Sequence, residues 1–268
     1  MIQNGTVAYN NENYEKALES FEKVIASYEK EGNPQECPVY DDAGLAAIRL
    51  GMPEKGIGYL ELSQTYNTAG PDAYMALSEY YRVKDNLSKE IDALAALEEK
   101  YPESDQAKQY RKRLFEVYVE SENWQPALET WSKLGPMKNT DPELLENYLL
   151  LNKELGNKDE ADDAAEKLLS TDQENIPALE WLAGKYYWKA ENRYQSEMEA
   201  YENNKTNRQY KKLLEAFETV SANFRTSLNY FKKLYTLSPS GDYARYLSNI
   251  YARLDDKEKA EYYKSLIK

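Results

Sequence analysis

Apolar residues recur at helical intervals along nearly the whole chain, and the longest regular series runs through residues 176–239. In the second half of this stretch the intervals are three, four and seven residues, through Tyr210, Leu214, Phe217, Phe224, Leu228, Phe231 and Leu234. The first half has a matching series, Tyr187, Tyr194, Met198 and Tyr201. Such spacing places side chains on one helix face, as in a coiled-coil hairpin. We therefore predict two long helices that meet at residues 203–207.

Thr206 and Gln209 support this boundary, because they fit the T-x-x-Q capping pattern at the start of a helix. Elsewhere no run of β-branched residues alternates as a strand would, and 11 Gly and 10 Pro punctuate the chain sparsely. The spacing predicts an all-α protein.

The helical pattern also repeats. A first helix around Gly5 is followed by a second beginning at Tyr14, with Ala17 and Phe21 one turn apart on its inner face. Later copies are displaced by about 39, 34, 37, 34 and 35 residues. The most regular copy spans residues 71–102 and ends in a proline.

This pattern resembles the tetratricopeptide repeat, a helix-turn-helix unit of about 34 residues. The resemblance covers essentially the whole chain and implies a right-handed α-solenoid of antiparallel helix pairs in a single domain, residues 1–268. Its seven expected units are residues 1–35, 38–69, 71–103, 105–138, 141–174, 176–239 and 240–268. In the sixth unit the second-helix signature arrives about 31 residues late, so one elongated helical hairpin is expected there.

Small residues where two helices cross allow a close approach of their axes. Three expected pairs keep that rule: Gly5 with Ala17, Gly44 with Gly56, and Ser248 with Ala260. Three positions depart from it and predict wider pairs: Phe115, Leu149 and Glu90. In the elongated unit, Gly184 and Phe231 are expected to hold the base of the hairpin. Gly51 and Gly156 are expected to close first helices in the left-handed conformation.

The charge balance limits the partners. The chain has 47 acidic and 34 basic residues, a net charge of -13. Such a field repels phosphate backbones, so nucleic acid is not expected as a partner, and basic proteins or peptides are favoured.

The composition also limits the chemistry. The chain has no His, which removes Ser-His-Asp triads and most zinc sites from consideration, and Cys37 is its single cysteine. Cys37 is interpreted as an ordinary thiol at a helix edge. The acidic segment 159–166 lacks the glycine of a calcium loop and is interpreted as a solvated face. We predict no enzyme activity, no metal and no cofactor.

No apolar run reaches the ~18–20 residues that span a bilayer. No signal-peptide segment is apparent either, although a leader removed from the chain would leave an extracytoplasmic location open. Location and oligomeric state stay open at this point.

By the resemblance, the first helices of successive units line a concave groove for a peptide or a partner helix. Trp181, Lys185, Trp188 and Asn192 share one face of the sixth unit's first helix. Two exposed indoles beside a lysine would anchor a peptide or a stacking ligand. The alternative is that both indoles pack against the neighbouring helix or the hairpin.

Arg245 and Asn249, one turn apart on the last unit's first helix, form a second candidate. They resemble part of the carboxylate clamp of some family members, but the first three units do not supply the rest of that clamp. Solvated charge is therefore the favoured interpretation, and it extends to Lys112 and Arg113, which stand among acidic residues.

The sequence thus predicts a non-enzymatic scaffold that binds a protein or peptide in the groove. The alternative function is an accessory protein that binds a small ligand or glycan through groove aromatics. The hairpin is either a docking arm or a self-packed element that stiffens the repeat array.

Overall fold

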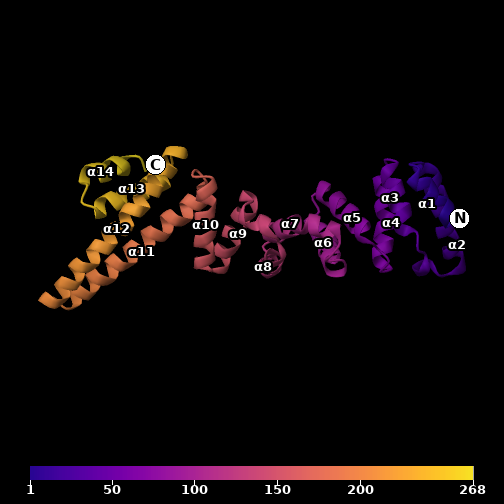
Figure 1. Cartoon of the computed structure of the whole chain (residues 1–268). Coiled ribbons are helices and arrows are strands. Elements are labelled where there is room, and N and C mark those ends of the chain that lie inside the picture. The colour runs from indigo at the N-terminus through magenta and orange to yellow at the C-terminus, as the bar shows by residue number, and fades with distance from the viewer. Residues whose placement is uncertain (268) are drawn as a thin grey trace. The chain divides into compact units, whose positions relative to one another are not determined.

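The computed structural model describes residues 1–267, which form fourteen α-helices and two short 3-10 segments and contain no β-strand (Figure 1). Lys268, the last residue of the final expected unit, lies outside the described residues. The chain divides into two compact units, Met1–Leu134 and Gly135–Lys268. The expectation of one continuous domain stays a prediction, and each unit is described by itself.

The first unit contains four helix pairs. Their helices are α1 (Ile2–Asn10), α2 (Tyr14–Glu31), α3 (Tyr40–Arg49), α4 (Pro53–Thr65), α5 (Pro71–Val83), α6 (Leu87–Lys100), α7 (Asp105–Glu120) and α8 (Trp124–Lys133), with a 3-10 segment η1 (Pro34–Glu36) after α2. Each first helix packs on the second helix of its own pair, and each second helix then packs on the first helix of the following pair.

The second unit contains three pairs and the longest helices. Its elements are η2 (Pro136–Asn139), α9 (Pro142–Leu155), α10 (Lys158–Thr171), α11 (Ile176–Asn203), α12 (Asn207–Leu237), α13 (Gly241–Arg253) and α14 (Lys257–Ser265). Residues 1–267 thus form seven consecutive helix pairs, which confirms the all-α repeat fold of antiparallel helix pairs.

The turns inside the pairs show the repeat directly. Each of the first five pairs has one residue with positive φ in the turn between its helices, and so does the last pair: Glu12, Gly51, Asp85, Glu122, Gly156 and Asp255. The first five are 39, 34, 37 and 34 residues apart, the displacements that the apolar pattern predicted. Two of these residues are glycines, as expected. At the others Asp or Glu takes the left-handed conformation, so glycine alone does not mark the turn.

Close packing follows the predicted small residues at two crossings. A Cβ atom on Gly44 would lie 2.9 Å from the carbonyl oxygen of Gly56. In the last pair the Ser248 hydroxyl donates to the carbonyl of Ala260 at 2.8 Å. At the hairpin base the expectation for Gly184 is wrong, because a Cβ there would meet no atom within 4 Å.

The close contact at the hairpin base uses the preceding residue. Ala183 is fully buried, and its carbonyl accepts a hydrogen bond from the Ser227 hydroxyl at 2.8 Å. A serine-to-carbonyl hydrogen bond thus joins the two helices of the sixth pair and of the last pair, from the second helix in the sixth and from the first helix in the last. Gly184 does not take part in this contact, and the space in which its Cβ atom would lie is empty.

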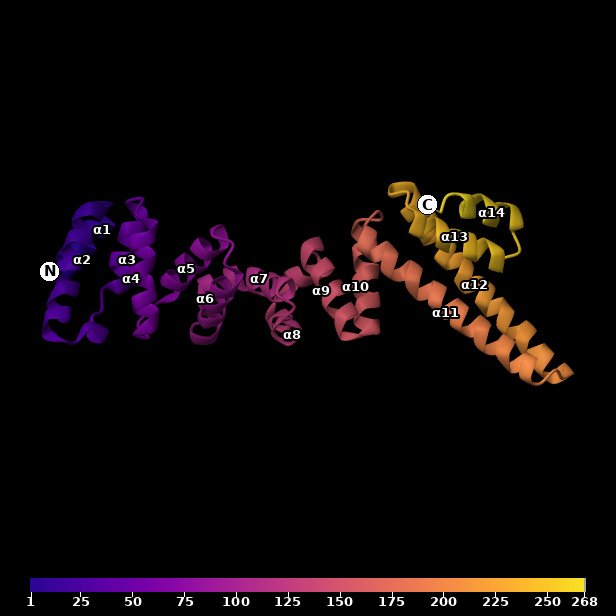
Figure 2. The same ribbon diagram turned by 180° about the vertical axis from the view of Figure 1, so that it is seen from behind.

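The elongated hairpin is confirmed. In both Figure 1 and Figure 2, α11 and α12 lie side by side along their length and extend beyond the helices of the neighbouring pairs. The helices have 28 and 31 residues, and the turn between them falls at residues 204–206. Thr206 caps α12 by accepting a hydrogen bond from the backbone N–H of Gln209 at 3.2 Å.

The predicted seam of α12 is correct near the base and wrong near the tip. Phe224, Phe231 and Leu234 are buried as expected. Towards the tip the buried positions are Leu213, Ala216 and Val220, whereas Tyr210 and Leu214 are each 47% exposed. Leu213 and Leu214 are adjacent, so two registers fit the apolar spacing, and the structure buries Leu213 together with Ala216.

The last pair braces the base of the hairpin. Arg253 of α13 donates from Nε and Nη2 to the two carboxylate oxygens of Glu191 on α11, at 3.0 and 2.5 Å. Its guanidinium also lies 4.1 Å from the ring centre of Tyr194. Beside it, Phe231 of α12 stacks on Tyr246 of α13 with ring centres 4.5 Å apart. These contacts tie both arms of the hairpin to α13.

An ion network in the first unit corrects the interpretation of Arg113 as a solvated charge. Its guanidinium donates to both oxygens of Glu90, at 2.8 and 3.1 Å, and to Glu120 at 2.7 Å. Glu90 is 3% exposed. It stands on α6, 23 residues before Arg113 on α7, so no local pattern in the sequence reveals the pair.

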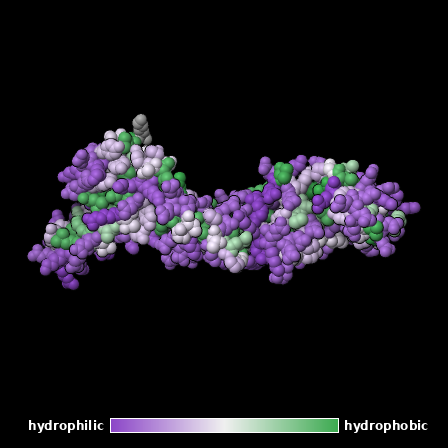
Figure 3. All heavy atoms as spheres, turned by 45° about the horizontal axis from the view of Figure 1, so that its top comes forward, coloured by the Kyte–Doolittle hydropathy of each residue, from purple (hydrophilic) through white to green (hydrophobic). Residues whose placement is uncertain are grey.

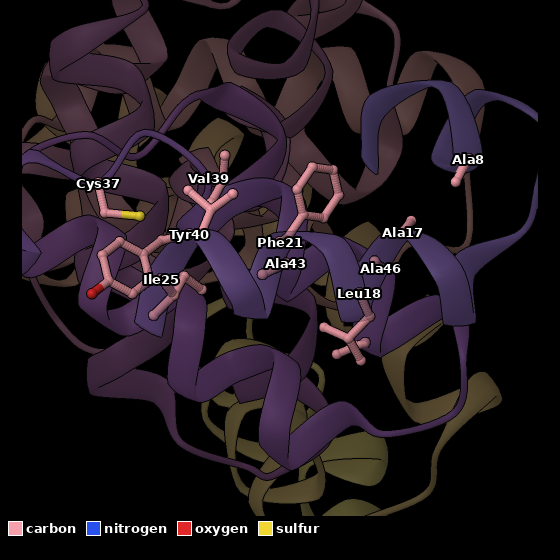
Figure 4. Close-up of a cluster of buried hydrophobic side chains, with 12 residues drawn as sticks. Ala8, Ala17, Leu18, Phe21, Ile25, Cys37, Val39, Tyr40, Ala43 and Ala46 are labelled. Atoms are coloured by element: carbon pink, nitrogen blue, oxygen red, sulfur yellow. The ribbon is translucent and has the colours of Figure 1, made fainter. Parts of the chain in front are cut away.

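The core consists of several hydrophobic clusters, and each of them joins residues of more than one helix pair. Figure 4 shows the cluster at the amino-terminal end, where Phe21 and Ile25 of α2 meet Val39 and residues of α3. Cys37 belongs to this cluster, is fully buried and forms no disulfide, and burial raises the pKa of its thiol. Hydrophilic residues cover most of the face seen in Figure 3, and apolar residues form separate patches.

Candidate functional site

A groove of about 810 Å³ opens on the second unit. It is lined by the exposed side of α9, the first turns of α10 and the face of α11 that carries the predicted residues. Trp181, Lys185, Trp188 and Asn192 all line it. The structure therefore brings the four residues of the first candidate site together around one concave surface.

Asp162 of α10 organises the floor of the groove. Its Oδ1 accepts a hydrogen bond from the indole N–H of Trp181 at 2.8 Å, and its Oδ2 lies 2.5 Å from Lys185 Nζ. Burial by itself would lower the pKa of Lys185, but the hydrogen bond and the charge of Asp162 outweigh it and leave this pKa raised. Trp181 and Lys185 are thus fixed to one carboxylate, and Lys185 keeps its charge.

The two indoles differ in exposure. Trp181 is half-buried against α10, as the alternative interpretation of these residues required. Trp188 is 52% exposed, and its ring system makes a T-shaped contact with Tyr187, with ring centres 5.1 Å apart. Trp188 therefore keeps a large apolar surface in the groove, while Tyr187 behind it is buried and packs on Phe224 and Tyr246.

A second exposed apolar side chain comes from α9. Leu150 lines the groove and is 40% exposed, whereas its neighbours Leu149 and Leu151 are buried. Leu150 is not among the residues that we predicted for the site. The available signal is three consecutive leucines on a helix, since they cannot all face the core. With Trp188, Leu150 gives the groove apolar surface on two first helices.

Two acidic side chains of the groove are held by residues at the beginnings of the next helices. Asn175, which caps α11, donates to Glu146 of α9. The hydroxyl of Tyr243, in the first turn of α13, donates to Glu180 of α11. Burial, and after it the neighbouring Glu180, raises the pKa of Tyr243 to about 12, so this phenol stays protonated and remains a donor.

Arg245 and Asn249, the second candidate, do not line this groove. Arg245 is exposed and lies 3.7 Å from Asp242, one turn before it. The Asn249 amide donates weakly to the hydroxyl of Tyr187 at 3.4 Å. A role for these two residues in binding a partner stays a prediction.

Residues 1–267 contain no group of three or more Cys, Asp or Glu side chains placed to hold a metal ion. Of the acidic segment 159–166, Asp162 is engaged with Trp181 and Lys185. Within the same residues no helix combines the length and apolar character needed to cross a membrane.

Comparison with known proteins gives matches at the level of structure. No family model matches the chain, and no curated protein does. A crystal structure of a candidate protein-binding protein from Bacteroides ovatus superposes with a TM-score of 0.55 at 16% identity, covering 81% of this chain and 98% of that one.

Two further solved structures are tetratricopeptide repeat proteins. One is from Parabacteroides merdae, with a TM-score of 0.42, 15% identity and coverage of 99% of this chain and 95% of that one. The other is the C-terminal part of a protein from Cytophaga hutchinsonii, with a TM-score of 0.43, 15% identity and coverage of 100% and 94%.

Proposed function

From the all-α fold of consecutive antiparallel helix pairs, which resembles that of tetratricopeptide repeat proteins, we propose that the chain is a non-enzymatic scaffold that binds a protein partner. The observation that carries the proposal is the groove of about 810 Å³ between α9 and α11, with Trp188 and Leu150 exposed in it. Large exposed aromatic side chains inside a concave surface are typical of binding hot spots. The proposed ligand is a peptide or a helix of the partner.

The groove is prepared for binding in two ways. Asp162 fixes Trp181 and Lys185 before any ligand arrives, which lowers the entropy lost on binding. Trp188 rests on the buried ring of Tyr187, so its exposed face also has a defined position. A ligand side chain that covers Trp188 would remove apolar surface from water without first reordering the site.

The expectation of a basic partner rests on the negative charge of the chain, and this charge differs between the two compact units. Residues 1–134 contain 24 acidic and 14 basic residues, whereas residues 135–268 contain 23 and 20. The excess negative charge therefore belongs mainly to the first unit. A basic partner remains our expectation for the first unit, and the same field supports the absence of nucleic-acid binding.

The test is partner capture with matched variants. Wild-type protein, Trp188→Ala and Tyr262→Ala are immobilised and exposed to a lysate of the source cells, and retained proteins are identified. Tyr262 is a suitable control because it is 59% exposed, aromatic and outside the groove. We expect a partner that Tyr262→Ala keeps and Trp188→Ala loses, with a loss in affinity of about 1–3 kcal/mol.

Two results would contradict this proposal. One is a partner that binds the Trp188→Ala variant as tightly as the wild type. The other is unfolding of the variant by circular dichroism, which would make Trp188 a core residue. Since the side chain is half exposed, we expect unchanged helicity.

A second candidate function is binding of a small ligand or glycan. The volume of the groove lies within the range of about 300–1,000 Å³ that is usual for small-ligand sites, and an exposed indole can stack on a sugar ring. Calorimetric titration with a panel of oligosaccharides separates the two functions. Heat of binding that disappears in Trp188→Ala would favour the glycan.

A further inference from the structure

Three lysines of the groove have no anionic partner among the described residues. Lys153, Lys158 and Lys189 line the groove, and each is exposed without an ion pair in that part of the chain. Lys185 differs, because Asp162 neutralises it. The chain has more acidic than basic residues, so most lysines could find an acidic partner. Three lysines of one groove that have no ion pair within residues 1–267 therefore stand out.

These three lysines lie at the same end of the groove. Lys153 is in the last turn of α9, and Lys158 begins α10 on the other side of a two-residue turn. The contact of Asp162 with Lys185 sets the antiparallel register of α10 and α11, since each residue lies nine positions from the connection between the two helices. In that register Lys158 is level with Lys189.

The acidic side chains lie towards the other end. Glu146 of α9 and Glu180 of α11 are each four residues from the start of their helix. From Glu180 to Lys189 the helix rises by roughly 13 Å, at about 1.5 Å per residue. Both carboxylates already accept hydrogen bonds, from Asn175 and Tyr243. The charges of the groove are therefore separated along its length.

Asp159 is the remaining acidic side chain at the lysine end, beside Lys158 in the first turn of α10. Among the side chains that line the groove, three lysines against this one carboxylate give the end a net positive charge, because the Asp162 and Lys185 charges cancel. Trp188, which adjoins Lys189 on α11, and Leu150, which is less than one turn before Lys153 on α9, place apolar surface next to that charge.

We propose that the groove binds an acidic peptide segment in which a large apolar side chain is flanked by carboxylates. The apolar side chain covers Trp188 and Leu150, and the carboxylates pair with Lys153, Lys158 and Lys189. Charge complementarity carries the choice of ligand, since the free cations of the groove lie around its exposed apolar surface. The inference rests on the proposed function and adds the chemical class of the ligand.

The experiment uses three synthetic peptides with blocked ends and the same tryptophan and leucine residues, flanked by glutamates, glutamines or lysines. Each is titrated calorimetrically into the full chain at about 50 and about 500 mM salt, and between these concentrations the screening length falls roughly threefold. We expect the glutamate peptide to bind at least about tenfold more tightly than the lysine peptide at low salt. The preference should shrink at high salt.

Two triple variants locate the effect. Lys153→Gln, Lys158→Gln and Lys189→Gln combined should weaken binding of the glutamate peptide by about tenfold. Lys205→Gln, Lys232→Gln and Lys257→Gln combined remove the same charge from exposed lysines outside the groove and should leave it unchanged. Equal loss in both variants would mean a diffuse charge effect and overturn the inference.

The outcomes separate this inference from the proposed function. Equal binding of all three peptides, or a preference for lysine, overturns the acidic ligand; if Trp188→Ala still abolishes that binding, the groove keeps its function. No binding of the glutamate peptide also overturns the inference. The proposed function then depends on partner capture alone, and it fails if Trp188→Ala retains every captured protein.

Discussion

The backbones of Gly44 and Gly56 approach so closely that a Cβ atom on Gly56 would lie 2.6 Å from the carbonyl oxygen of Gly44. The obstacle is backbone, which cannot rotate away as a side chain can. We expect Gly56→Ala to push α3 and α4 apart and to destabilise the protein by about 1–3 kcal/mol. The urea-unfolding midpoint, followed by circular dichroism, measures this cost.

Gly184→Ala is the matched control, because it is also a glycine within a helix, but a Cβ there meets nothing within 4 Å. It should stabilise α11 by about 0.5–1 kcal/mol, since alanine is the better helix former. Equal effects of the two substitutions would show that the α3–α4 crossing is looser than described.

Glu90 offers a test in which two effects compete. Glu90→Ala restores the small residue that the repeat prefers at this position, but it removes the buried partner of Arg113. We expect the loss to dominate and to cost about 3 kcal/mol in the free energy of unfolding, because a partly buried guanidinium is left with less compensation. Denaturant unfolding measures the difference.

The double variant Glu90→Ala with Arg113→Met removes both charges and serves as the control for that prediction. It should recover most of the lost stability. If the single variant is as stable as the wild type, the preference for a small residue outweighs the ion pair.

The ion pair between Glu191 and Arg253 should make the stability of the protein depend on pH. Burial acts to raise the pKa of Glu191, but the hydrogen bonds from Arg253 and Gln195 and the Arg253 charge outweigh it and hold this pKa below the ordinary value of 4.5. A carboxyl whose pKa is lowered by folding stabilises the folded state fully above its unfolded pKa. That contribution is lost as the pH falls through the folded pKa.

Glu191→Gln should therefore be less stable than the wild type at pH 7, by about 1–3 kcal/mol, and the difference should narrow as the pH falls below about 4.5. Melting temperatures from pH 7 to pH 3 measure it. Glu258→Gln, on an exposed residue of α14, is the control. A gap that stays constant with pH would contradict the assigned pairing.

Ala127 tests the repeat register in the first unit. Its side chain is fully buried on α8. Ala127→Asp places an unpaired charge there and should cost roughly 3–5 kcal/mol. Gln125→Asp adds the same charge at an exposed position of the same helix and should change the melting temperature little. An unchanged melting temperature for Ala127→Asp would mean that the register is wrong.

The sequence predicted the helix pairs well because their signals are local. The spacing of apolar residues follows the helical period, and the left-handed turns recur at the displacements found from that spacing. The length of α11 and α12 was also visible, since the second-helix pattern arrived late. The seam near the tip was not, because Leu213 and Leu214 are adjacent and only packing on α11 separates them.

Only the α11 side of the candidate site was predicted from the sequence. Trp181, Lys185, Trp188 and Asn192 share a face of one helix, so spacing brought them together. The contribution of α9 and α10 to the groove depends on how the α9–α10 pair packs against α11, within the second compact unit. Asp162 binds Trp181 across 19 residues, and nothing local distinguishes it from the other acids of the segment 159–166. For the same reason the pairing of Glu90 with Arg113 required the structure.

The different surroundings of the tryptophans provide an intrinsic fluorescence probe. In the first unit Trp131 is 8% exposed and Trp124 is half-buried; in the second Trp181 is half-buried, whereas Trp188 is 52% exposed in the groove. A collisional quencher such as acrylamide should reach the Trp188 indole most readily, and an occupant of the groove should shield it. Emission from Trp188 thus reports occupancy without a label, and the Trp188→Phe variant supplies the blank.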